Sequence, residues 1–293
     1  MTVAFGRLEY LGGQLAPLLI WGAGNVKRAC IFVDGENFRH SLKSLFQNGC
    51  FSFRKGDYLP SADWYHFFTS IANRFDCELL RTYWYVVEHV DCLPYRIPHE
   101  WREKERVLAR WYGDRIQACA SDPERREVLK AIERDLETAR TAIEKRARGW
   151  REVQASIESH NDRLEFRRSG SIPYTLATKQ FGIEKGVDTQ LATDMIVHSG
   201  MYDVAIILSG DADYLPPVAA VKARGRLVCS VSFLDQNGRQ LPGGARRLSN
   251  AVDSRADLPF EAVRTGLSIS RVDQEELDLE ESAVAPRGVN PRS

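Results

Sequence analysis

Two short apolar runs, each ending at an acidic residue, constrain the fold of this chain most. Residues 29–33 are followed by Asp34, and residues 203–209 are followed by Gly210 and Asp211. A short apolar run that is stopped by polar residues and glycine is typical of a strand buried in a parallel sheet. The chain is therefore expected to be an α/β protein with a central, mainly parallel sheet.

The segments around these runs alternate between helical and strand-like patterns. Strands are expected at 78–87, 163–168 and 226–233, with a turn at 169–171, and helices at 36–47, 61–75, 187–198 and up to 224, where Gly225 ends the last one. Strands and helices that alternate this closely require right-handed crossovers. We therefore expect helices on both faces of the sheet.

The middle of the chain differs from both ends because it is charged, poor in glycine and helical from about residue 100 to 160. Ser121, Pro123 and Glu124 form a helix start, and from Val128 to Ile157 apolar residues recur every third or fourth position. This pattern predicts a long amphipathic helix packed on the helix before it. A solvated arm is the simplest interpretation, and a clamp over the substrate or a contact between two copies of the chain is the alternative.

These shifts in pattern divide the chain into five segments. We expect a loosely packed N-terminal extension (1–27), the first part of the α/β domain (28–99), a helical insertion (100–162), the second part of the domain (163–266) and a mobile acidic tail (267–293). Within this tail, residues 273–281 carry six acids in nine positions, a composition that does not support a packed core.

The composition excludes several classes of protein. The 40 basic and 40 acidic residues among 293 give a net charge of zero, which excludes a uniformly basic nucleic-acid binder but allows a local basic patch. No run of roughly 18 apolar residues is present, so no membrane helix is expected. The six cysteines form no C-x-x-C pair, which predicts reduced, buried thiols, a cytoplasmic location and no structural zinc.

Acidic residues gather where the strands of the sheet are expected to end. Asp34, Asp211 and Asp213 follow strands, while Asp188 and Asp194 share one helix. Ligands of open parallel sheets bind beyond the carboxyl ends of the strands. Crowded carboxylates repel one another unless a cation neutralises them, and oxygen ligands favour Mg²⁺ or Mn²⁺. Such a site suits phosphodiester hydrolysis, although each aspartate taken alone also fits a turn or helix cap.

Three motifs in this order resemble the NYN family, whose domains are PIN-like nucleases related to the 5′-nucleases. The matching segments are 31–38 (IFVDGENF), 184–194 (EKGVDTQLATD) and 207–214 (ILSGDADY). The resemblance covers about residues 28–235, with the helical segment as an insertion. It implies a PIN-like Rossmannoid three-layer fold and a metal-dependent nuclease that usually acts on RNA.

The resemblance also implies roles for individual residues. The metal-binding acids would be Asp34, Asp188, Asp211 and Asp213, with Asp194 as a further ligand or supporting acid. Asn37 would orient a water or a substrate phosphate, and Ser209 would hold the end of its strand or donate to phosphate. Glu36 is expected to point away from the site.

Basic residues near these motifs are candidates for contacts with the nucleic-acid backbone. They are Lys185, beside the motif at 184–194, and four residues of the basic stretch 222–247: Lys222, Arg224, Arg246 and Arg247. Phosphate contacts of this kind bind without reading sequence and weaken with salt. The aromatic run 83–85 could stack on bases, but on a strand it is better explained as core.

The sequence thus predicts a divalent-metal-dependent endoribonuclease, with two alternatives kept. A DNA-directed or flap-type nuclease of the same fold shares every motif, and a non-catalytic RNA-binding or interaction module would keep the fold without the chemistry. Toprim and haloacid-dehalogenase sites fit less well, because they need a glutamate in place of Asp34 and an aspartate in place of Glu36, respectively.

Overall fold

A computed structural model describes residues 26–46, 51–53, 57–242 and 245–271. Nearly all of the expected N-terminal extension, and the tail beyond residue 271, lie outside these residues. Within them, one eight-stranded sheet organises the molecule, and its strand order is β4-β3-β2-β1-β5-β6-β7, with β8 also paired to β6. The arrangement confirms the expected PIN-like Rossmannoid α/β fold.

Most neighbouring strands of the sheet run parallel. The strands are β1 (Lys27–Asp34), β2 (Cys77–Leu93), β3 (Leu164–Thr175), β4 (Gln180–Phe181), β5 (Val204–Leu208), β6 (Leu227–Leu234), β7 (Gln240–Leu241) and β8 (Ser254–Pro259). Only the two-residue strands β4 and β7 pair antiparallel, on β3 and β6. Strand β1 lies between β2 and β5, so the ends of β1 and β5 meet at one edge of the sheet.

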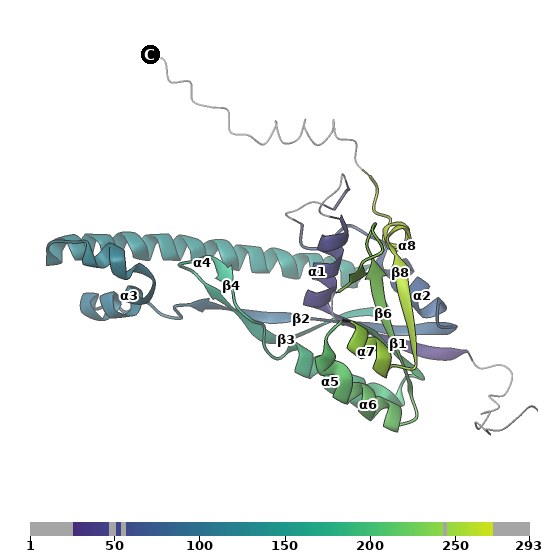
Figure 1. Ribbon diagram of the computed structural model, residues 1–293. Helices are drawn as coiled ribbons and strands as arrows, with labels where there is room; N and C mark the ends of the chain where they lie inside the picture. The colour runs from purple at the N-terminus through teal and green to yellow at the C-terminus, as the bar shows by residue number, and fades with distance from the viewer. Residues whose placement is uncertain (1–25, 47–50, 54–56, 243–244, 272–293) are drawn as a thin grey trace, which may run out of the picture.

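Helices cover both faces of the sheet (Figure 1). One face carries α1 (Gly35–Phe46), α2 (Trp64–Asn73) and α8 (Phe260–Gly266); the other carries α5 (Val187–Val197), α6 (Leu215–Ala223) and α7 (Arg246–Ala251). Successive side chains of β1 alternate between two buried cores, with Ile31 and Val33 in one and Phe32 in the other. This alternation explains why the run is apolar throughout.

The aromatic run on β2 belongs to these two cores. Trp84 packs in the core under α1 and α2, whereas Tyr83 and Tyr85 pack in the core under α5. All three are at most 2% exposed, so the interpretation as core is confirmed.

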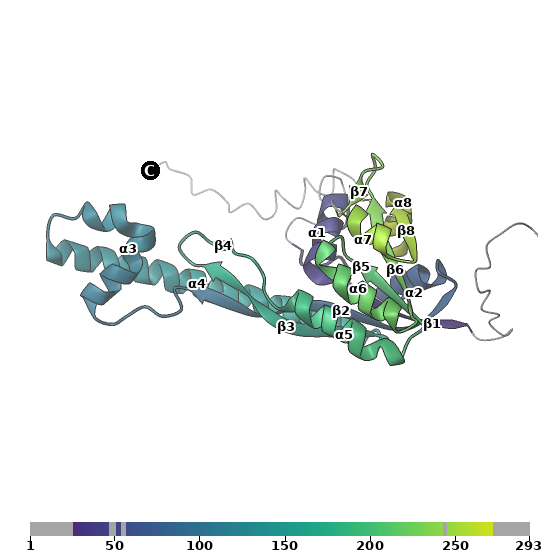
Figure 2. The same ribbon diagram turned by 60° about the horizontal axis from the view of Figure 1, so that its bottom comes forward.

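The helical insertion forms an arm that extends from the sheet (Figures 1 and 2). Strands β2 and β3 stay paired well beyond the end of β1, and the insertion between them folds into α3 (Trp101–Gln117) and α4 (Asp122–Ser159). As expected, α4 begins at an N-cap, with Ser121 Oγ accepting a hydrogen bond from the Glu124 N–H, and it packs on α3 through a separate apolar cluster. In the part of the chain that the structure describes, no helix combines the length and apolar character needed to cross a membrane.

The turn expected at residues 169–171 is wrong, because β3 continues through this segment. The backbone of Ser171 exchanges two hydrogen bonds with Lys185, at 3.0 and 2.9 Å, while β2 pairs on the other side. Gly170 has a φ of +64°, and a Cβ there would lie 2.1 Å from the Lys185 carbonyl oxygen. The glycine is therefore required by a close approach of two segments and not by a reversal of the chain.

The cysteines that the structure describes are reduced and buried, as their spacing predicted. Cys30, Cys77, Cys92, Cys119 and Cys229 are free thiols and are buried. Cys50 lies outside the described residues. Burial raises the pKa of Cys30 and Cys229 to about 12, which keeps both thiols protonated at neutral pH.

Candidate functional site

Asp34 is the centre of the acidic edge formed by the ends of β1 and β5. Its side chain is 7% exposed and accepts hydrogen bonds from the Asn37 N–H at 3.1 Å and the Ser209 hydroxyl at 2.8 Å. Burial raises its pKa from 3.8 to about 6 despite these two donors, and the nearby charges of Asp188 and Asp211 raise it further. The two hydrogen bonds therefore hold the carboxylate in a fixed position. Both donors are neutral, so neither offsets its negative charge.

Asp188 is joined to Asp34 through a buried tyrosine. The Tyr214 hydroxyl lies 2.7 Å from one oxygen of Asp188 and 3.4 Å from one oxygen of Asp34. Burial is the largest cause that raises the pKa of Tyr214, and the charge of Asp34 and the hydrogen bond to Asp188 raise it further. The phenol therefore keeps its proton and remains a hydrogen-bond donor. Tyr214 was part of a recognised motif, but its position between the two carboxylates could not be read from the sequence.

The start of α5 is held in place by the glycines beside it. Gly186, the residue before α5, has a φ of +97°, a left-handed conformation that favours glycine. Its Cα lies close to Gly170 on β3, and the paired backbones of Lys185 and Ser171 connect the same two segments. Asp188, in the first turn of α5, is thereby fixed relative to the sheet.

Asp211 and Ser209 complete the edge on the β5 side. The Ser209 hydroxyl donates to Asp34 and accepts a hydrogen bond from the Asp211 N–H at 3.1 Å. Asp211 in turn accepts from the Asp213 N–H at 2.9 Å and so caps η2 (Ala212–Tyr214). Ser209 thus holds the geometry at the end of its strand, which was one of its two expected roles.

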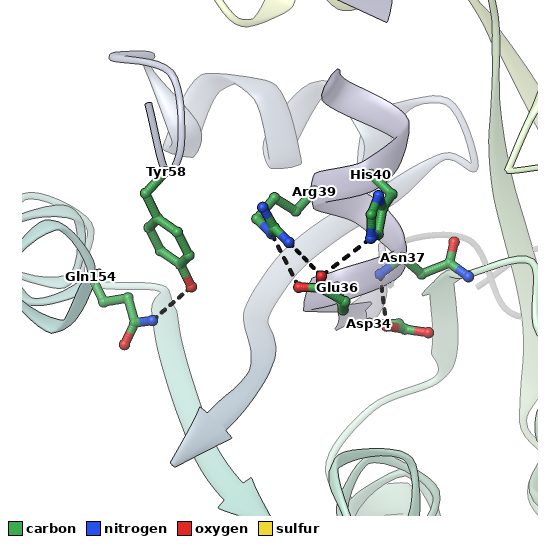
Figure 3. A network of polar contacts seen from close by, with 7 residues as sticks. All are labelled: Asp34, Glu36, Asn37, Arg39, His40, Tyr58 and Gln154. Carbon is green, nitrogen blue, oxygen red and sulfur yellow. Dashed lines mark hydrogen bonds and ion pairs between the residues drawn. The ribbon is translucent and has the colours of Figure 1, made fainter. Parts of the chain in front are cut away.

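Glu184 is a further acid of this edge, and the sequence analysis gave it no role. Burial raises its pKa from 4.5 to about 7, and the charges of Asp188, Asp34 and Glu36 contribute. The signal in the sequence is its place at the start of the motif 184–194, four residues before Asp188. Glu36 itself points to the opposite side from Asp34 and Asn37, as expected, and pairs with Arg39 and His40 (Figure 3).

The arrangement can be tested for its fit to a divalent cation. Among the described residues, no three His, Cys, Asp or Glu side chains already stand close enough to enclose an ion. The chemistry of the donors nevertheless fits Mg²⁺ or Mn²⁺, because carboxylates crowd at one edge and their charges help to raise the pKa of Asp34 and Glu184. The Asn37 Oδ1 atom is also buried without a hydrogen-bond partner beside Asp34. A cation would neutralise the crowded carboxylates, and a water bound to it would give the Asn37 Oδ1 atom a hydrogen-bond partner.

One expected metal ligand, Asp194, lies apart from this centre, and another, Asp213, is exposed. Asp194 is buried and both of its oxygens are engaged, by the Tyr85 hydroxyl at 3.1 Å and the Gln190 amide at 2.8 Å. It lies six residues after Asp188 on α5, a distance of about 9 Å along the helix axis. The Asp213 carboxylate is exposed and has no partner within the described residues, and only its N–H takes part in the cap.

The structure separates the expected phosphate-binding residues into two groups. Lys185 is exposed directly before Gly186, and Arg246 and Arg247 are exposed at the start of α7. Ala245, just before them, packs against Gly210, so these three residues lie near the acidic edge. Lys222 and Arg224 lie at the other end of α6: Lys222 pairs with Asp253, and Arg224 donates to the Ile196 carbonyl. The fold does not bring this second pair to the acids.

Replacement of Glu184 by glutamine is expected to stabilise the metal-free protein at alkaline pH. The folded carboxyl holds its proton up to about pH 7, whereas the unfolded chain releases it near pH 4.5. The free energy of unfolding of the wild type therefore falls as the pH rises between these values. At pH 8 in EDTA, Glu184→Gln should raise it by about 1–3 kcal/mol, and the gain should shrink towards pH 5.

Urea unfolding at the two pH values measures this difference. Glu152→Gln is a suitable control, because Glu152 is exposed on α4 and has no partner among the described residues. Equal gains in both variants, or a gain that does not change with pH, would contradict the proposed burial and repulsion at Glu184.

Comparison with known protein families identifies the family of this chain. The sequence profile of the NYN domain matches residues 28–257. No curated protein shows significant similarity to the chain. Among solved structures, a protein of unknown function from Vibrio parahaemolyticus is similar with a TM-score of 0.40 and 13% identity, covering 81% of this chain and 96% of the other. Because the NYN profile spans most of the sequence, including all three acidic motifs, this chain belongs to the NYN domain family of the PIN-like nuclease superfamily.

Proposed function

We propose that this protein is a divalent-metal-dependent endoribonuclease. The observation that supports it most is the convergence of Asp34, Asp188, Asp211 and Glu184 at one edge of the sheet, where burial and mutual repulsion raise the pKa of Asp34 and Glu184. An acidic cluster with no internal cation is costly to fold unless it binds one. Membership of a nuclease superfamily supports phosphodiester hydrolysis as its chemistry.

Asp34, Asp188 and Asp211 are the proposed ligands of the cation. A divalent ion held there would lower the pKa of an attacking water and offset negative charge at the phosphate. Ser209 fixes Asp34 and the Asp211 backbone together, and Tyr214 fixes Asp188. These hydrogen bonds keep the carboxylates in place before the substrate arrives, which is the main contribution of a protein to such a site.

The remaining site residues are proposed to act around this centre. Asn37 has a free buried carbonyl oxygen that suits a water or a phosphate-bound water. Asp213 is available as an additional ligand, and Asp194 supports α5 through Tyr85. Lys185, Arg246 and Arg247 are exposed and are proposed to contact phosphates of the bound strand.

Cleavage of a circular single-stranded RNA tests the proposal directly. We expect the purified protein to linearise it with Mn²⁺ or Mg²⁺, to stop in EDTA and to resume when metal is restored. Only an endonuclease can open a substrate without ends, so this design separates endonuclease from exonuclease activity. Structured RNA and circular single-stranded DNA run in parallel distinguish an RNase from a DNA-directed or flap-type nuclease.

Two results would count against the proposal. If no substrate is cut with any metal, the protein is not a nuclease under these conditions, and RNA binding without cleavage would favour the non-catalytic alternative. If cutting persists in EDTA, the acidic edge does not act through a divalent cation.

A further inference from the structure

A cavity beside the acidic edge has no role in the proposed chemistry. It measures about 290 Å³, close to the lower end of the range for small-ligand sites, and lies between α4, the paired strands β2 and β3, α1 and the β4 segment. We propose that this cavity binds one unpaired nucleobase of the RNA strand next to the bond that is cut. The inference rests on the proposed nuclease function and assigns the substrate class as single-stranded RNA.

Aromatic rings form one wall of the cavity. Tyr58 and Trp150 stack with ring centroids 5.5 Å apart and an angle of 20°, and Phe181 lies 5.9 Å from Trp150. Gln154 fixes Tyr58 by donating to its hydroxyl at 2.8 Å (Figure 3). Fixed aromatic faces are the surfaces on which proteins stack unpaired bases.

The opposite side of the cavity is apolar, and polar groups stand at its mouth. Val86, Val90 and Ile172 come from β2 and β3. Glu36 and His40 of α1, whose side chains pair with each other at 3.2 Å, add a carboxylate and a ring nitrogen to the lining. This combination suits a flat heterocycle, whose faces are apolar and whose edges need hydrogen-bonding partners.

Basic residues stand near the cavity, and two arginines, Arg39 and Arg151, line it together with the acids Glu36, Glu88 and Glu184. Residues 145–151 of α4 contain four basic residues and no acid: Lys145, Arg146, Arg148 and Arg151. The Arg146 guanidinium lies over Trp150, 5.2 Å from the ring centroid. Burial lowers the pKa of Lys43, and the charges of nearby Arg39 and Arg146 lower it further while the charge of Glu36 raises it. A phosphate backbone would pair with these cations.

The cavity borders the acidic edge at two residues. Gly35, which directly follows Asp34, and Glu184 both line it. A base held against Trp150 therefore places its own sugar and phosphate towards Asp34 and Asp188. A base that is paired inside a duplex cannot enter such a cavity, so the structure favours unpaired RNA as the substrate.

Binding of a short, fluorescently labelled single-stranded RNA in EDTA tests the proposal without cleavage. Trp150→Ala should weaken binding roughly 5- to 100-fold, the range for loss of one base stack, whereas Trp150→Phe should retain most of it. Trp111→Ala is the matched control, because Trp111 is also a half-buried arm tryptophan under an arginine, Arg110, at 5.3 Å. Its affinity should equal that of the wild type.

A second variant guards against a general defect in the arm. Ala147 lines the cavity, so Ala147→Leu should fill it and weaken binding while Trp150 remains in place. Circular dichroism checks that both variants stay folded. An RNA with one abasic nucleotide should bind the wild type more weakly than the intact RNA, but should lose less further affinity in Trp150→Ala.

The outcomes separate this inference from the proposed function. Unchanged affinity in folded Trp150→Ala and Ala147→Leu, or no RNA binding by the wild type, overturns the base-binding cavity. Cleavage by the wild type with unchanged affinity in both variants leaves the nuclease assignment standing alone. Trp150-dependent binding without metal-dependent cleavage supports the cavity and contradicts the nuclease.

Discussion

The Asp34→Asn variant is expected to cut RNA on the order of 10³-fold more slowly than the wild type, the scale for loss of one key electrostatic group in an active site. The charges of Asp188 and Asp211 both raise the pKa of Asp34. Its carboxylate accepts hydrogen bonds from Ser209 and Asn37. Asparagine keeps the shape of the side chain and one acceptor oxygen for the Asn37 N–H. The loss of cleavage activity should therefore come from the missing negative charge and not from unfolding of the variant.

Single-turnover cleavage of labelled RNA with Mn²⁺ measures this effect. Thermal unfolding with and without Mn²⁺ supplies a second readout, since the shift caused by metal should vanish in Asp34→Asn and in Asp211→Asn. Asp162→Asn is the control, because Asp162 is exposed just before β3, at the edge opposite to the acids. Wild-type cleavage by Asp34→Asn would remove Asp34 from the site.

The Gly35→Ala variant is expected to lose on the order of 3 kcal/mol of folding free energy, the upper part of the range for overpacking a core. A Cβ at Gly35 would lie 2.1 Å from the Tyr85 carbonyl oxygen, which is backbone and cannot rotate away. Strand β2 or the start of α1 would have to move. The melting temperature should fall by about 6–12 °C for a domain of this size.

Differential scanning calorimetry compares Gly35→Ala with Gly149→Ala, whose melting temperatures are expected to change in opposite directions. Gly149 lies inside α4, and nothing stands within 4 Å of a Cβ added there. Alanine is favoured over glycine in a helix by up to about 1 kcal/mol, so Gly149→Ala should melt slightly higher. A loss of similar size in both variants would show that the close contact at Tyr85 is not the cause.

Local pattern predicted most elements of the fold correctly. The apolar run at 29–33 became β1, the N-cap at Ser121 began α4, and Gly225 ended α6. The pattern failed where the partner was distant in sequence. The segment 169–171 has the composition of a turn, yet its backbone pairs with β2 and with Lys185. Strand β8 was not anticipated because only its pairing with β6 identifies it.

In the candidate site too, local motifs predicted some residues correctly, whereas positions that depend on the tertiary structure were not predicted. Asp34, Asp188 and Asp211 were selected from their motifs, and the structure brings them together through Ser209 and Tyr214. The basic stretch predicts phosphate contacts for Lys222 and Arg224, but a helix separates them from the acids. Charge density along the sequence does not show which end of a helix a residue occupies in space.

The sequence by itself determined the family, the α/β class and the acids that follow the strands, because buried parallel strands and their terminal carboxylates are local patterns. Only the tertiary structure decided which groups share one environment. It placed Glu184 close enough to Asp34 for the charge of Asp34 to raise its pKa, and it lined one cavity with both Gly35 and Trp150 of the arm. The physical reason is that pKa shifts, cavities and stacking depend on distances in space between residues more than a hundred positions apart.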